Sequence, residues 1–117
     1  MNKRETGTEY EEIAAKFLSK NGVKIIERNF RCRIGEIDLI GYDGKYLVFF
    51  EVKYRAGTGK GYPLEAVTKG KRNTIKRVSD YYRMIHHVSE FDPVRFDVVS
   101  ILGDDINWIK NAFDYYC

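Results

Sequence analysis

An Asp-Gly pair at residues 43–44 stands between two apolar runs, 34–42 and 45–53, which are rich in Ile, Val, Leu and Phe. Such a pair is a strong signal for a two-residue turn between antiparallel strands, because Asp and Gly tolerate the backbone that this turn needs. We therefore expect the two runs to form a β-hairpin. A third run of the same kind at 23–30 predicts another strand before it.

Two segments have the spacing of amphipathic helices, at 8–20 and at 70–87. Asn21-Gly22 marks the end of the first. The apolar residues expected to face the core are Ile13, Ala14, Phe17 and Leu18 in the first helix, and Ile75, Val78, Tyr82 and Ile85 in the second.

Strands are also expected at 94–102, which has the composition of a buried strand, and at 106–109. Between hairpin and second helix, 56–61 contains three glycines and predicts a flexible loop, and Pro63 begins a short turn or helix. The order αβββαββ joins a hairpin to a helical crossover. It predicts an α/β fold in which helices flank a mixed β-sheet.

The chain has 117 residues, of which 44% are hydrophobic, so residues 1–117 can form one domain with a real core. Cys32 and Cys117 are too few for a metal-binding cluster and give no reason to invoke export. The sequence also shows no apolar leader and no run of about 18 apolar residues. We therefore expect a soluble, cytoplasmic protein with no membrane partner.

The charge is unevenly distributed, although the formal net charge is only +3. Residues 69–87 contain six basic side chains and a single acidic one, Asp80. A charge run usually marks a solvated helix face, but an unopposed basic surface also suits the phosphates of nucleic acid. The candidate contacts are Lys69, Lys71, Arg72, Lys76 and Arg77 on the helix, with Arg55 and Lys60 beside it. No base-reading element is evident, so structure-selective or weakly specific binding of nucleic acid is expected rather than sequence recognition.

Charged residues interrupt the two strands of the hairpin. Side chains on a strand alternate between faces, so Glu36 and Asp38 share one face, and Glu51 and Lys53 share one face. A buried charge needs a partner, and one explanation is an Asp38–Lys53 salt bridge or exposure at the strand ends. The other is a Mg²⁺ site with Asp38 and Glu51 as oxygen ligands. Lys53 would then orient or deprotonate the attacking water, or stabilise charge on a phosphate.

Asp38, Glu51 and Lys53 on consecutive strands after a helix resemble the PD-(D/E)xK signature of restriction endonucleases and archaeal Holliday junction resolvases. More specifically, the chain resembles the YraN family of uncharacterised bacterial proteins. The matching motifs are Arg28-Asn29, residues 35–40 (GEIDLI), residues 47–55 (LVFFEVKYR), Glu65-Ala66-Val67 with Lys71, residues 95–99 (RFDVV) and Asn111-Ala112-Phe113. The proline of the signature is absent, since Ile37 precedes Asp38.

The resemblance implies a restriction-endonuclease-like αβββαβ core. It also implies an endonuclease that acts on DNA, including branched or structured DNA, with bound Mg²⁺ or Mn²⁺. Asp38 and Glu51 would be metal ligands and Lys53 the catalytic lysine. Because resolvases of this fold act as dimers, it further suggests a homodimer. The fold also has members without catalysis, so the alternative is an inactive nucleic-acid-binding or protein-interaction module.

Resolvases of this fold present a further glutamate from the first helix, and Glu11 is the matching residue. Acids near a helix N-terminus also stabilise the helix without any function, which leaves both interpretations of Glu11 open. Glu36 is the alternative third carboxylate, unless it pairs with Arg31, Arg33 or Arg55. Asp97, next to Arg95 and Phe96 in a buried strand, predicts a structural ion pair, and His86-His87 lack a third metal ligand.

Overall fold

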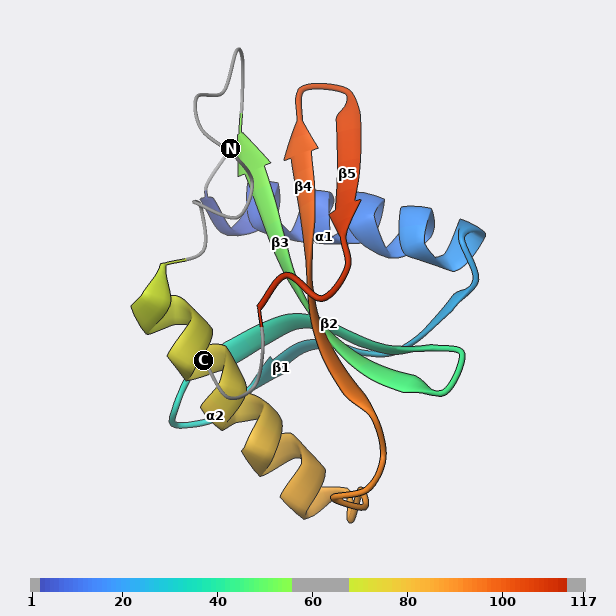
Figure 1. Cartoon of the computed structure of the whole chain (residues 1–117). Coiled ribbons are helices and arrows are strands. Elements are labelled where there is room, and N and C mark those ends of the chain that lie inside the picture. Colours follow the sequence, from blue (N-terminus) through green and yellow to red (C-terminus); the bar gives the residue numbers. More distant parts are fainter. Residues whose placement is uncertain (1–2, 56–67, 114–117) are drawn as a thin grey trace.

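The computed structural model describes the backbone of residues 3–55 and 68–113, with side chains from residue 9 onward except that of Arg55 (Figure 1). The elements are α1 (Lys3–Lys20), β1 (Val23–Arg31), β2 (Glu36–Asp43), β3 (Tyr46–Arg55), α2 (Lys69–Ile85), β4 (Val94–Leu102) and β5 (Asp105–Ile109). Their order and type agree with the prediction, and the strand at 94–102 is reproduced without change. The predicted loop at 56–61, Pro63, Lys60 and Cys117 lie outside the described residues.

The five strands form one mixed sheet in the order β1-β2-β3-β4-β5. The hairpin is confirmed, because β2 and β3 pair antiparallel and Asp43 lies opposite Tyr46, with Gly44 in the left-handed region at φ 60°. β3 and β4 are parallel, as the α2 crossover between them requires. The outer pairs β1·β2 and β4·β5 are antiparallel.

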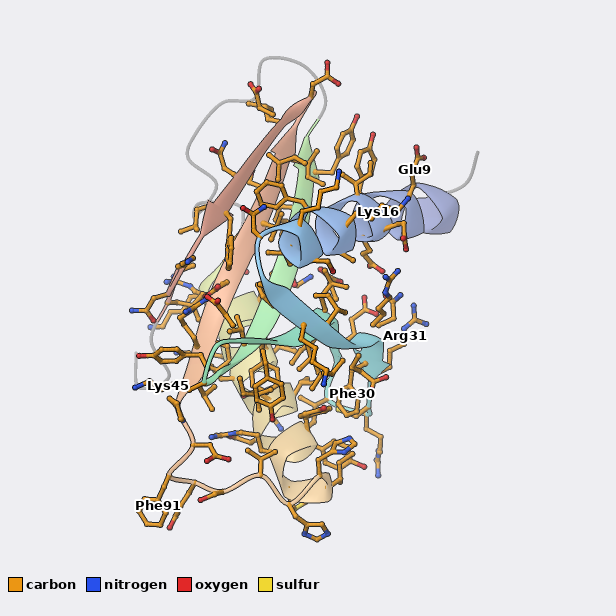
Figure 2. All side chains as sticks on the ribbon, turned by 90° about the vertical axis from the view of Figure 1, so that its right-hand side faces the viewer. Glu9, Lys16, Phe30, Arg31, Lys45 and Phe91 are labelled. Carbon is orange, nitrogen blue, oxygen red and sulfur yellow. The ribbon has the colours of Figure 1, made fainter. Side chains whose placement is uncertain are left out.

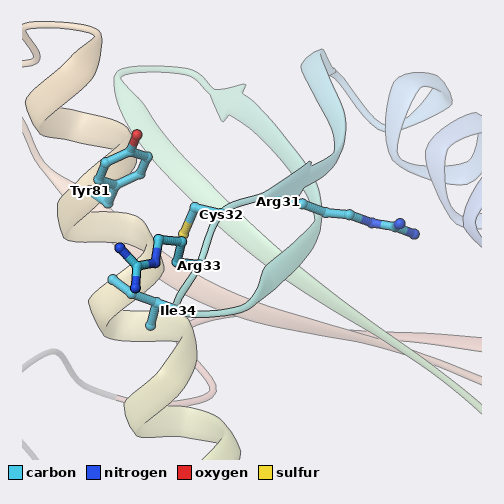
Figure 3. Close-up of a pocket in the computed structure, with 5 residues that line it drawn as sticks. All are labelled: Arg31, Cys32, Arg33, Ile34 and Tyr81. Atoms are coloured by element: carbon cyan, nitrogen blue, oxygen red, sulfur yellow. The ribbon is translucent and has the colours of Figure 1, made fainter.

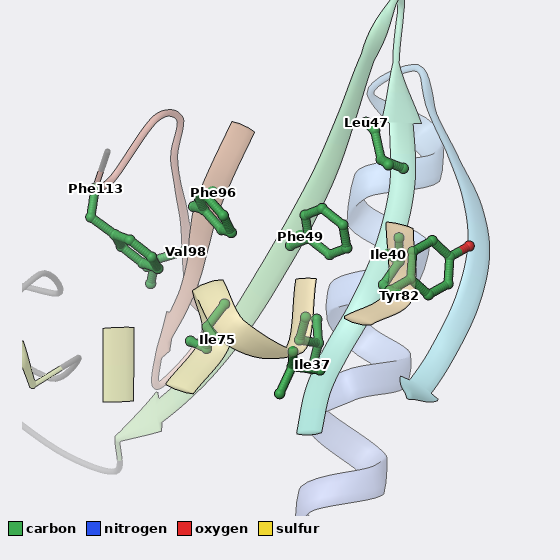
Figure 4. Packing of buried hydrophobic residues seen from close by; sticks show 10 residues of the cluster. Ile37, Ile40, Leu47, Phe49, Ile75, Tyr82, Phe96, Val98 and Phe113 are labelled. Atoms are coloured by element: carbon green, nitrogen blue, oxygen red, sulfur yellow. The ribbon is translucent and has the colours of Figure 1, made fainter. Parts of the chain in front are cut away.

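The two helices cover opposite faces of the sheet: in Figure 1, α1 passes behind the strands and α2 lies in front of them. Ala14, Ala15 and Leu18 of α1 pack on one face with Leu39, Val48 and Phe50, among others. Figure 4 shows the other core, where Ile75 and Tyr82 of α2 meet residues of β2, β3 and β4. Strand residues therefore alternate between two cores, which explains the continuous apolar runs in β3 and β4.

The solvent sides of the helices are polar, and Glu9 and Lys16 point outward from α1 (Figure 2). One predicted core position is wrong: Ile85 is 41% exposed, because it lies at the last residue of α2 where the helix leaves the sheet. Thr68 caps the N-terminus of α2, accepting a hydrogen bond from the Lys71 amide. No helix within the described residues is long and apolar enough to cross a membrane.

Candidate functional site

The antiparallel ladder between β2 and β3 ends at the Leu39–Phe50 pair, and Asp38 and Glu51 are the next residues on the two strands. Beyond this point, a side chain replaces the backbone pairing: the amide of Val52 donates a hydrogen bond of 2.8 Å to Oδ2 of Asp38. β3 remains paired with β4 throughout this region. The two predicted metal ligands are therefore held where β2 and β3 begin to separate.

Glu51 is the buried acid of this site, and its side chain is 4% exposed. Two ammonium groups reach the same oxygen, Oε1: Lys53 Nζ at 3.4 Å and Lys71 Nζ at 3.0 Å. Glu51 and Lys53 share the face of β3 that carries Phe49 and is covered by α2, in agreement with the predicted alternation. Lys53 thus pairs with Glu51, and the alternative of an Asp38–Lys53 bridge is not the arrangement found.

Asp38 is surrounded by charge from three other elements. Burial raises its pKa to about 8, and the charges of Glu51 and Glu11 act in the same direction. The Val52 hydrogen bond and the charge of Lys71 oppose this rise without cancelling it. An Asp with such a pKa carries a proton at neutral pH, and a cation among these acids would favour its ionised form.

Glu11, on the third turn of α1, belongs to the same cluster. Burial raises its pKa, and hydrogen bonding with Asn29 and Asp38 offsets this only in part. Its Oε1 is buried and has no hydrogen-bond partner. A buried carboxylate oxygen without a donor is costly, so this atom is a free position for a cation or a water.

The other candidate for the third carboxylate, Glu36, is exposed and forms a salt bridge of 3.0 Å with Arg31. That pairing was one of its predicted alternatives. Glu36 acts on the cluster at longer range, since its charge contributes to the raised pKa values of Glu11 and Lys71. Of the two candidates, the geometry brings Glu11 to Asp38.

Lys71 is the residue whose role was underestimated from the sequence, where it was assigned only to nucleic-acid contact. Burial would lower its pKa, but the ion pair with Glu51 outweighs this and raises it. One signal could have located it. A crossover helix starts near the edge of the sheet where the preceding strand ends, which places the first turn of α2 close to Glu51 and Lys53.

The donor set fits a hard cation. Asp38, Glu51 and Glu11 supply only oxygen ligands, and Mg²⁺ usually takes one or two carboxylates, with waters and substrate phosphate completing its shell. Within residues 9–54 and 68–113, however, no group of three or more His, Cys, Asp or Glu side chains is arranged to hold a metal ion. Both lysines contact Oε1 of Glu51, so a metal would compete with them for that oxygen.

The basic surface of α2 is partly as predicted. Lys69, Lys71 and Arg77 are exposed and Arg72 is half-buried, but Lys76 is 8% exposed and its Nζ lies 5.9 Å from the centre of the Phe113 ring. A pocket of about 250 Å³ lies on the first turns of the helix, lined by Lys69, Arg72, Asn73 and Lys76. Lys76 therefore reaches this pocket from a buried stem and does not project from an open helix face. Lys60 is outside the described residues, and of Arg55 only the backbone is described.

Asp97 is fully buried and structural, as predicted. Arg95 binds both of its oxygens, at 2.8–3.2 Å, and the Trp108 indole and the Asn111 amide also donate to it. Arg95 reaches Asp43 as well, which lowers the pKa of Asp43. His86 and His87 are exposed beyond the end of α2, where His86 lies against Tyr82.

Comparison with known proteins gives a family without an assigned activity. A model of the uncharacterised protein family UPF0102 matches residues 10–101. Similar curated proteins, each named UPF0102 protein, include one from Lachnoclostridium phytofermentans, 47% identical over 99% of this chain and 98% of its own length. Another from Caldicellulosiruptor saccharolyticus is 45% identical over 97% of this chain and its full length. A third from Legionella pneumophila is 40% identical over 97% of this chain and 98% of its own length.

Proposed function

The chain belongs to the uncharacterised protein family UPF0102, and we propose that it is a metal-dependent DNA endonuclease of the PD-(D/E)xK type, related to the archaeal Holliday junction resolvases. The observation that carries this proposal is the position of Asp38, Glu51 and Lys53. Two acids and a lysine meet where the β2–β3 ladder ends, beside a glutamate from α1 and a lysine from α2.

Asp38 and Glu51 would hold Mg²⁺ or Mn²⁺, with Glu11 as the third carboxylate. When bound, such an ion polarises the phosphoryl group and makes its coordinated water a stronger nucleophile. Lys53 holds its ammonium beside Glu51 with 27% of the side chain exposed, so it can donate to the attacking water or to the phosphate oxygens. Water attack would form a new P–O bond and break the P–O bond to the sugar oxygen of the leaving strand, and that oxygen would take up a proton as the water loses one.

The first turns of α2 would position the DNA. Lys69, Lys71 and Arg72 present positive charge on these turns, where each contact with a phosphate would release counterions. Such contacts orient the backbone without reading its sequence. Lys71 also touches Glu51, so the same helix turn connects phosphate binding with the acidic site.

A second function has a specific observation in its favour. Lys53 and Lys71 neutralise Glu51 without a metal, and among the described residues no group of three or more His, Cys, Asp or Glu side chains is arranged to hold a metal ion. A protein that kept this fold only to bind nucleic acid or a protein partner would show the same pairs. The two functions differ in turnover.

The test is a cleavage assay on duplex, single-stranded, flapped and four-way DNA with Mg²⁺ or Mn²⁺. We expect cleavage by the wild type, its loss in Asp38→Asn and in Lys53→Ala, and unchanged DNA binding by Lys53→Ala. Glu36→Gln is the matched control for Asp38, since it removes an exposed acid from the same strand. DNA binding without cleavage of any substrate would support the binding module instead.

A further inference from the structure

A second pocket, of about 490 Å³, lies between the β1–β2 turn and α2 and is lined by Arg31, Cys32, Arg33, Ile34 and Tyr81 (Figure 3). It is separate from the acids and from the pocket on the first turns of α2. Its volume is in the range of small-molecule and nucleotide sites. The proposed chemistry makes no use of it.

The walls of this pocket are fixed by local structure. The Cys32 amide donates a hydrogen bond of 2.9 Å to the Gly35 carbonyl, which closes the turn. The backbone of Gly35 lies so close to α2 that a Cβ at this position would be only 2.6 Å from Cγ2 of Thr74. The ring of Phe30 packs edge-on against Tyr82, with 5.1 Å between centroids. The space beside Tyr81 is therefore formed before any ligand arrives.

The lining combines a flat apolar wall with positive charge. Tyr81 is 38% exposed, and Ile34 and Cys32 lie opposite its ring (Figure 3). Arg33 is exposed and has no ion pair within the described residues, whereas Arg31 extends away from the pocket toward α1 and pairs with Glu36. A planar apolar group carrying an anion satisfies both parts of this lining.

We propose that this pocket binds one unstacked nucleotide of the DNA substrate, with its base against Tyr81 and Ile34 and its phosphate at Arg33. This inference rests on the proposed function, because the nucleotide must belong to the strand held at the acids. Tyr and Arg are the side chains on which single bases stack in proteins that bind unpaired strands. The substrate class is thus DNA that offers an unpaired nucleotide a few positions from the cleaved bond.

The position of the pocket allows one DNA strand to reach from the acids to Tyr81. Arg31, which lines the pocket, forms a salt bridge with Glu36, two residues before Asp38. Along α2, Tyr81 lies about 15 Å from Lys71, at about 1.5 Å per residue. That length corresponds to about four base steps of one strand at about 3.4 Å each. A strand held at Lys71 can therefore extend to Tyr81.

The experiment measures DNA binding in EDTA, so that no cleavage occurs, with 2-aminopurine either unpaired in a one-nucleotide bulge or fully paired. We expect the wild type to bind the bulged DNA about tenfold more tightly and to quench its fluorescence by stacking. Tyr81→Ala and Arg33→Gln should each remove most of this preference, while Tyr81→Phe keeps the ring and the quenching. Tyr46→Ala is the matched control, because Tyr46 is 36% exposed on a distant strand end.

Equal binding of the two DNAs by the wild type, with no quenching, overturns the pocket proposal. If duplex binding then still depends on Lys69 and Arg72, the proposed function stands without the nucleotide pocket. Failure to bind any DNA overturns both. Sedimentation of the same variants supplies a last contrary outcome: a dimer that dissociates on Tyr81→Ala, with no change in base preference, would assign the pocket to a second copy of the chain.

Discussion

Replacing Asp38 by Asn should make the metal-free protein more stable while removing the proposed metal site. The carboxyl is partly buried beside Glu51 and Glu11, and its pKa rises from 3.8 to about 8. At pH 7 the folded protein therefore keeps a proton that the unfolded chain has released. At about 1.4 kcal/mol per pKa unit, this costs about 4 kcal/mol. Asn needs no proton and its oxygen can still accept from the Val52 amide, so we expect a gain on the order of 2–4 kcal/mol.

The pH dependence has a definite sign. Between pH 4 and pH 8 the folded state holds more protons at Asp38 than the unfolded state, so this group lowers stability as pH rises. Urea unfolding in EDTA from pH 5 to pH 9 should show that the advantage of Asp38→Asn grows with pH and levels off above pH 8. A variant that is equal to or less stable than the wild type at pH 8 would refute the reasoning.

Asp97→Asn is the contrasting control for this prediction. Asp97 is as buried as a core residue, but Arg95, Trp108 and Asn111 all donate to it. Removing its charge leaves the Arg95 guanidinium, with only 12% of its side chain exposed, without its main partner. We expect a loss of about 3 kcal/mol. These two carboxylates, on the strands that flank β3, should thus respond in opposite directions, because only Asp97 has a cationic partner and further donors at its oxygens.

Three further outcomes are expected. The double variant Lys69→Gln/Arg72→Gln should reduce the slope of the logarithm of the duplex-binding constant against the logarithm of salt concentration by about 2. The control double variant Lys16→Gln/Lys24→Gln, which changes two exposed lysines away from α2, should leave this slope unchanged. Lys71→Met should destabilise the metal-free protein by up to about 1 kcal/mol and increase the stabilisation that Mn²⁺ gives in thermal unfolding, since Glu51 loses one of two lysines. Gly41→Ala should cost about 1–3 kcal/mol in urea unfolding, because its Cβ would meet the Lys24 carbonyl at 2.6 Å, whereas Gly70→Ala meets nothing and should gain about 0.5 kcal/mol.

The sheet could be predicted because its signals are local. Asp43-Gly44 specifies the turn by its backbone preferences, and the period of two along a strand places Glu51 and Lys53 on one face. The β3–β4 pairing follows from the helix between them. Each of these depends on residues within a few positions of one another, or on a general rule of chain connection.

The details of the site could not be obtained in the same way. The end of the ladder at Leu39–Phe50 depends on how the sheet twists between its two cores, which no local pattern records. The Lys71–Glu51 pair joins residues on different elements, and Lys76 is buried because Phe113 covers it from the far end of the chain. The pocket at Tyr81 likewise depends on the close packing of Gly35 on α2.

The most direct test of the proposed site is the anomalous scattering of Mn²⁺ in crystals of the protein bound to DNA. The account predicts one peak within about 2.0–2.3 Å of carboxylate oxygens of both Asp38 and Glu51, with Lys71 moved away from Glu51 and toward a phosphate. A map without manganese between these two acids, in which Lys53 and Lys71 still hold Glu51 while DNA is bound, would contradict the claim that they form a metal site.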